Sequence, residues 1–72
     1  MSPTAARVAQ VVYRYSPSAV CFSCLAEHER LKEHDVRAMA LVLIVRAGLH
    51  AVRQPCASCG RLAEALVAQK AA

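Results

Sequence analysis

Four cysteines constrain this chain more than any other feature of its sequence. They form two Cys-x-x-Cys pairs, Cys21/Cys24 and Cys56/Cys59, which use every cysteine among the 72 residues. Two such pairs supply the four thiolates of a tetrahedral zinc site. Gly60 directly follows the second pair, where a positive φ lets the backbone turn back. We therefore predict that the four cysteines together bind one zinc ion.

Other interpretations of the cysteines fit the sequence less well than zinc. Small buried hydrophobic residues would rarely fall into two such pairs by chance. Two disulfides would suit an oxidising compartment, but no secretory hydrophobic segment is recognisable, and a redox dithiol needs only one pair. His28 follows Cys24 by four residues and is an alternative fourth ligand. Oxidation of the thiols with loss of zinc is compatible with any function of the chain.

The predicted zinc site is structural. Four thiolates close the coordination shell and leave no position for the water that a catalytic zinc activates. A domain of this length buries only about 60% of its unfolded surface, and zinc binding can add on the order of 10 kcal/mol to folding. The sequence also offers no paired carboxylates and no Ser/His/Asp set. We predict that residues 1–72 form a single zinc-stabilised domain, which is not an enzyme.

The first half of the chain predicts two helices. Ser2-Pro3 is a helix-start signal and predicts a helix over residues 3–15. Ser16-Pro17 repeats the signal and predicts a second helix over residues 17–30, with Cys21 and Cys24 one turn apart on one face. The residues that recur at the spacing of one buried face in the first helix are Val8, Val11, Val12 and Tyr15.

A long apolar run marks the predicted third helix. Asp35 is the expected N-cap of a helix over residues 36–47, and Gly48 is its expected end. Every residue between Arg37 and Arg46 is apolar, a run too short to span a bilayer, so we expect no membrane partner. A helix that is apolar on all sides must be largely buried or face a partner, such as a second copy in an isologous homodimer. A buried strand is the alternative for the middle of this run.

The last third of the chain predicts a small β-hairpin. Residues 49–54 alternate apolar and polar side chains as a half-exposed strand does, and the cysteine turn at 56–60 follows. Residues 61–68 suit either a second strand or a helix, while residues 69–72 are predicted to fray. The predicted fold class is therefore mainly α with a small β-hairpin.

This succession of elements resembles a winged helix-turn-helix domain. The resemblance rests on residues 24–31 in the second helix, 33–37 at the start of the third, and 45–49 leading into the wing. It covers nearly the whole chain and concerns an architecture. It implies that the third helix enters the major groove of double-stranded DNA and that the wing touches the DNA backbone or minor groove. The positions that the resemblance assigns to DNA contacts are His34, Arg37, Arg53 and Arg61.

Two function classes remain open from the sequence. The first is a small cytoplasmic DNA-binding regulator of transcription with a structural zinc. The formal net charge of +4 falls to about +2 once the zinc-bound thiolates are counted, so the basic balance is mild. Seven of the nine basic residues are arginine, which suits contacts with phosphate and guanine and equally suits a codon bias. The second is a protein–protein interaction module on the same zinc scaffold, which dimerises or binds another protein without binding DNA.

Overall fold

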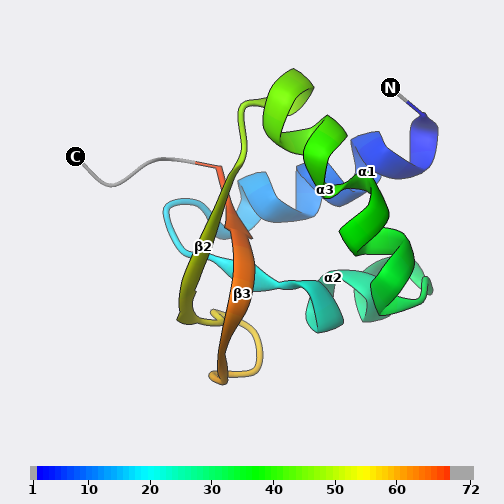
Figure 1. Cartoon of the computed structure of the whole chain (residues 1–72). Helices are drawn as coiled ribbons and strands as arrows, with labels where there is room; N and C mark the ends of the chain where they lie inside the picture. The colour runs from blue at the N-terminus through cyan, green and yellow to red at the C-terminus, as the bar shows by residue number, and fades with distance from the viewer. Residues whose placement is uncertain (1, 69–72) are drawn as a thin grey trace.

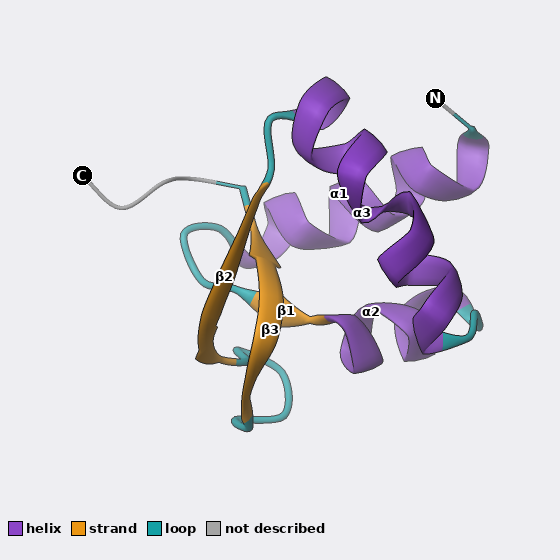
Figure 2. Cartoon of the chain, viewed as in Figure 1, coloured by secondary structure: helices purple, strands orange, loops and turns teal. Residues whose placement is uncertain are grey.

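The computed structural model describes residues 2–68 and contains three helices and one three-stranded sheet (Figure 1). All strand pairs are antiparallel, and the strand order is β1-β3-β2. Figure 2 shows the helices gathered on one side of the sheet. The fold is therefore a small mixed α/β domain. The elements, in chain order, are α1 (Pro3–Tyr15), β1 (Val20–Cys21), α2 (Phe22–Glu29), α3 (Glu33–Ala47), β2 (His50–Pro55) and β3 (Leu62–Val67).

The predicted first helix is confirmed with the expected bounds. The Ser2 hydroxyl accepts a hydrogen bond from the Ala5 backbone N–H at 3.1 Å, which satisfies one donor of the first turn. Val8 and Val12 are fully buried, and Tyr15 is half-buried at the end of the same face. Local signals are sufficient here because the cap and the buried face agree.

The second helix begins five residues later than predicted. Residues 17–21 are not helical, because Val20 and Cys21 form strand β1 against β3. The helix-start signal of Ser16-Pro17 is overridden by this pairing, which satisfies backbone groups and buries Val20 completely. The prediction of a helix over residues 17–30 was therefore wrong for residues 17–21. The helix ends before Arg30, whose φ of 55° is left-handed.

The third helix begins earlier than predicted, and Asp35 is not its N-cap. Lys32 holds that position, and Asp35 is the third residue of the helix. Its carboxylate accepts a hydrogen bond from the Lys32 backbone N–H at 3.4 Å. A negative charge in the first turn also suits the positive end of the helix dipole. The predicted end is confirmed, since Gly48 follows Ala47 with a φ of 70°.

The β2–β3 hairpin answers the question left open for residues 61–68, which contain a strand and not a helix. Pairing runs from His50 opposite Val67 to Pro55 opposite Leu62. The two cysteines of the second pair lie in the loop that joins these strands. The predicted fraying of residues 69–72 lies outside the described residues.

The core lies between the helices and the sheet and forms one continuous cluster. Within residues 2–68, no charged or polar residue is buried, and none of the helices is long and apolar enough to cross a membrane. The largest fully buried side chains are Leu25, Leu43, Leu49, Leu66, Val8, Val12, Val20 and Val36.

Candidate metal centre

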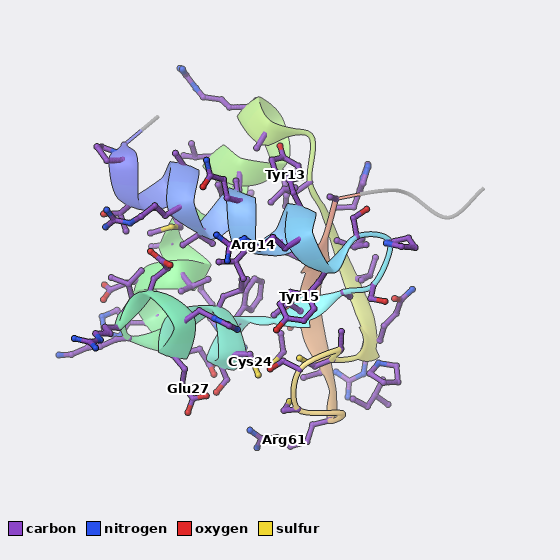
Figure 3. All side chains as sticks on the ribbon, turned by 180° about the vertical axis from the view of Figure 1, so that it is seen from behind. Tyr13, Arg14, Tyr15, Cys24, Glu27 and Arg61 are labelled. Carbon is purple, nitrogen blue, oxygen red and sulfur yellow. The ribbon has the colours of Figure 1, made fainter. Side chains whose placement is uncertain are left out.

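The four cysteine sulfurs converge from two distant parts of the chain. Cys21 ends β1 and Cys24 lies in the first turn of α2, while Cys56 and Cys59 lie in the hairpin loop. All four sulfurs lie within 4.8 Å of one another. Figure 3 shows Cys24 beside the loop that carries the second pair. The structure thus brings together the four residues that the sequence predicted as metal ligands.

The spacing of the sulfurs fits a single tetrahedral ion. Metal–sulfur bonds of about 2.3 Å place the corners of a regular tetrahedron about 3.8 Å apart. The Sγ atoms of Cys21 and Cys59 are separated by 3.7 Å. Four thiolates at these distances could therefore close around one metal with small side-chain movements.

The first pair is positioned by the strand-to-helix junction. Cys21 is the N-cap of α2, with extended backbone angles, and Cys24 is the third residue of the helix. Side chains at these two positions face each other, as they do in a capping box. The pairing of β1 with β3 therefore preserves the convergence that a continuous helix was expected to provide.

The second pair lies in a tight loop that backbone hydrogen bonds define. The Cys56 N–H donates to the Arg61 carbonyl at 2.9 Å, and the Gly60 N–H donates to the Cys56 carbonyl at 2.8 Å. Gly60 has a φ of 79°, as the sequence predicted. The Ala57 N–H donates to the carbonyl of Ala19 at 2.8 Å, which fixes the loop against the segment before β1.

Cys56 has the sulfur best suited to a negative charge. Its Sγ accepts backbone N–H groups of Cys21, Ser58 and Cys59 at 3.4, 3.3 and 3.5 Å. Burial acts to raise the pKa of Cys56, but these hydrogen bonds lower it to about 6. These backbone donors favour the thiolate form of Cys56.

The other sulfurs have different environments. Burial raises the pKa of Cys24 to about 12, and it also raises the pKa of Cys21. Cys59 is exposed, and its pKa is lowered by the backbone N–H and then the guanidinium of Arg61. A bound metal would have to displace the protons held by the two buried thiols of the first pair.

His28, the alternative fourth ligand, is not part of this cluster. Within the described residues, the group that could hold a metal consists of the four cysteines. The His28 ring lies edge-on to Tyr15, with 6.0 Å between the ring centroids, and its Nε2 is 3.5 Å from the Tyr15 hydroxyl. The imidazole therefore belongs to a contact between α1 and α2.

The basic residues proposed for DNA contact occupy different surroundings. His34 is exposed at the start of α3, with its Nε2 3.3 Å from a carboxylate oxygen of Asp35. Arg53 is exposed on β2, opposite Glu64 in the ladder, and Arg61 is exposed beside the cysteine loop. Each of these three residues thus has different neighbours.

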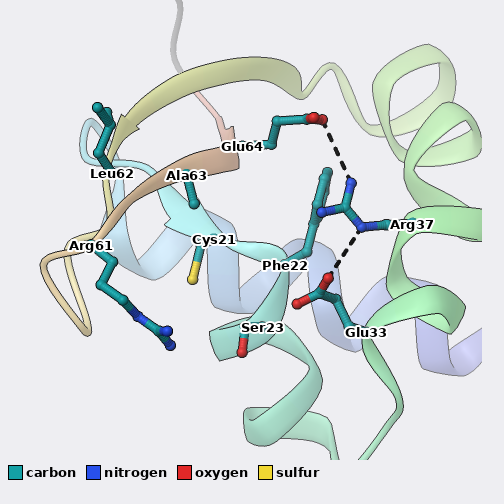
Figure 4. Close-up of a pocket in the computed structure, with 9 residues that line it drawn as sticks. All are labelled: Cys21, Phe22, Ser23, Glu33, Arg37, Arg61, Leu62, Ala63 and Glu64. Carbon is teal, nitrogen blue, oxygen red and sulfur yellow. Dashed lines mark hydrogen bonds and ion pairs between the residues drawn. The ribbon is translucent and has the colours of Figure 1, made fainter.

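Arg37 is held by interactions within the chain. Its Nε donates to a Glu33 carboxylate oxygen at 3.3 Å, and its Nη1 lies 3.7 Å from a Glu64 oxygen (Figure 4). Its guanidinium carbon also lies 4.8 Å from the ring centre of Phe22. The carboxylates of Glu33 and Glu64 thus compensate the positive charge of Arg37, the residue that the resemblance assigned to a DNA contact. The sequence did not reveal Glu64 as a partner of Arg37, because the two residues lie far apart along the chain.

A pocket of about 220 Å³ separates Arg37 from Arg61 (Figure 4). Phe22 and Leu62 line it together with Glu33 and Glu64, and Cys21 connects it to the sulfur cluster. Both signs of charge border this small space, so it does not form a basic surface.

One face of α3 is apolar and exposed to solvent. Leu41 and Val45 are 74% and 80% exposed, and Val42 is 42% exposed. With the exposed Ala38 they recur at the spacing of one helical face, which we call the α3 apolar face. The sequence could not separate it from the buried face, because both faces are apolar.

Comparison with protein-family models, curated proteins and solved structures gave no match. The function is therefore inferred from the geometry of the chain itself.

Proposed function

We propose that the chain is a winged-helix-like domain stabilised by one structural zinc ion. The order α1-β1-α2-α3-β2-β3 supports this architecture, with the short β1 completing a sheet with the hairpin. A shell of four thiolates in tetrahedral spacing suits zinc, and it leaves no site for substrate or water. The ion joins the start of α2 to the tip of the hairpin, and no enzymatic step is assigned to it.

The function that the geometry supports best is binding to another protein through the α3 apolar face. The observation that carries this proposal is the exposure of Leu41 and Val45, two large aliphatic residues one helical turn apart. A helix that reads DNA presents hydrogen-bond donors and acceptors to the base edges. The α3 apolar face presents aliphatic side chains, which gain free energy when a partner covers them.

DNA binding is the second candidate function. In the winged-helix arrangement, the start of α3 and the hairpin both approach the duplex. His34 lies at that start, and the exposed Arg53 and Arg61 lie on or beside the hairpin. Such binding would depend mainly on phosphate contacts and would weaken as salt increases.

Site-specific photo-crosslinking in the cells that produce the protein tests the first function. A photoreactive amino acid in place of Val45 should form an adduct with another protein chain. The same group in place of Arg14, which is exposed on α1, should form none. Absence of any adduct from position 45 would contradict the proposal.

Fluorescence anisotropy with labelled duplex DNA at low salt tests the alternative. Zinc-loaded wild-type protein should not bind the duplex if the α3 apolar face is the functional surface. Binding that is weakened by Arg53→Ala and unaffected by Leu41→Ala would overturn the first function in favour of DNA recognition.

A further inference from the structure

The α3 apolar face is complementary to itself when the helix is reversed. Together with His34, whose side chain is 74% exposed, it contains a row at positions 34, 38, 41 and 45. This spacing is that of the seam between two packed helices. The spacing is the same in both directions along the helix. If a second copy packs against this row in the antiparallel direction, Leu41 of each copy lies opposite Ala38 of the other, a large residue against a small one.

The charges at the two ends of α3 select the antiparallel orientation. Glu33 and Asp35 lie in the first turn, and Arg46 lies in the last. In the antiparallel register given above, Arg46 lies opposite Glu33 of the second copy, whose carboxylate also accepts a hydrogen bond from Arg37 of its own chain. The symmetry repeats this contact. A parallel pair would instead place the two Arg46 side chains together. Within residues 2–68, Arg46 forms no ion pair, so its charge is available.

We propose that the α3 apolar face binds the same face of a second copy of this chain, with the two α3 helices antiparallel. The arrangement is isologous, so each copy contributes the same residues and the assembly closes as a dimer. This inference rests on the proposed function and names the partner of the same surface. It also makes the exposed face of α3 unavailable to DNA while the dimer persists.

The contact is one helix wide, which limits its strength. Interfaces below about 1,200 Å² of total buried area are usually weak or transient. We therefore expect a reversible equilibrium between monomer and dimer in the micromolar to millimolar range. Dimer formation should be visible as an increase of apparent mass with protein concentration.

Sedimentation equilibrium of the zinc-loaded protein tests the dimer. Leu41→Glu should weaken self-association at least tenfold, because it places a charge in the centre of the seam. Leu62→Glu is the matched control, since Leu62 is 59% exposed on β3 and is not part of the α3 apolar face, and it should leave the association unchanged. Zinc content and circular dichroism of both variants should equal those of the wild type.

A charge exchange tests the orientation. Arg46→Glu and Glu33→Arg should each weaken the dimer, and the double variant should restore it if the helices are antiparallel. A dimer that survives Leu41→Glu, or a double variant weaker than both single ones, would overturn the proposed interface.

A wild-type protein that stays monomeric up to millimolar concentration would overturn the dimer. Crosslinking from position 45 then separates the two proposals. An adduct with a different protein would preserve the interaction function, and absence of any adduct would remove both.

Discussion

Leu41 and Leu43 lie two positions apart on α3, and the same substitution should destabilise the fold much more at Leu43 than at Leu41. Leu43 is completely buried, while Leu41 is 74% exposed. Truncation of each residue to alanine therefore tests which faces of α3 the core and the solvent occupy. The α3 apolar face exists only if this orientation is correct.

The expected effects differ by more than 2 kcal/mol. Leu43→Ala removes a fully buried side chain and should lower the free energy of unfolding by about 3 kcal/mol, within the range of about 2–5 found for such changes. Leu41→Ala loses only the covered quarter of its side chain, about 0.5 kcal/mol, and the higher helix propensity of alanine offsets part of that. For a domain of this size, about 3 kcal/mol corresponds to a decrease in Tm of roughly 12–24 °C.

Urea unfolding followed by circular dichroism measures both effects. All variants must be compared at the same free zinc concentration, because metal binding adds to the apparent stability. The protein should be dilute, so that self-association does not stabilise the wild type. Equal destabilisation by the two substitutions would show that α3 is rotated, and it would remove the basis for the α3 apolar face. A negligible effect of Leu43→Ala would show that α3 does not pack on the core.

Three predictions concern the metal centre. The purified protein should contain about one zinc per chain by elemental analysis. Cys56→Ser should lose the zinc and much of the helical signal. Ser58→Ala should retain both, because Ser58 contributes its backbone N–H to the site. A folded, metal-free Cys56→Ser variant would contradict the structural role of the metal. Arg61→Ala should increase the rate of zinc loss to a chelator about tenfold, because the guanidinium lies beside Cys59. Arg53→Ala is the control, and equal rates in the two variants would show that Arg61 does not support the site.

Much of the fold could be predicted where local signals decide it. The bounds of α1 follow from Ser2-Pro3 and one buried face, and the end of α3 follows from Gly48. Strand β1 could not be predicted in this way, since its two residues are extended only because β3 lies beside them. A pairing partner so distant in the chain leaves no local periodicity to detect.

The candidate site shows the same division. Residue type and spacing identified the four cysteines, because few arrangements need two Cys-x-x-Cys pairs. The unequal environments of their sulfurs were not predictable, since the Cys21 N–H reaches Cys56 across the fold. The paired state of Arg37 was equally hidden, because Glu64 lies far away in the sequence. Contacts between distant segments thus decide the charge of the site and of its surroundings.

The metal centre also bears on why α3 carries two apolar faces. The inner face of α3 contributes Val36, Ala40 and Leu43 to the core. The C-terminal end of α3 leads into one end of the hairpin, and the cysteine loop lies at the other end (Figure 1). A metal that joins the hairpin tip to α2 can supply stability that so short a chain does not obtain from burial alone. Folding therefore does not require Leu41 and Val45, and polar residues at these positions would improve solubility. Their exposure is explained if a partner covers them, so Leu41→Glu should weaken that binding at least tenfold while the fold and the zinc remain.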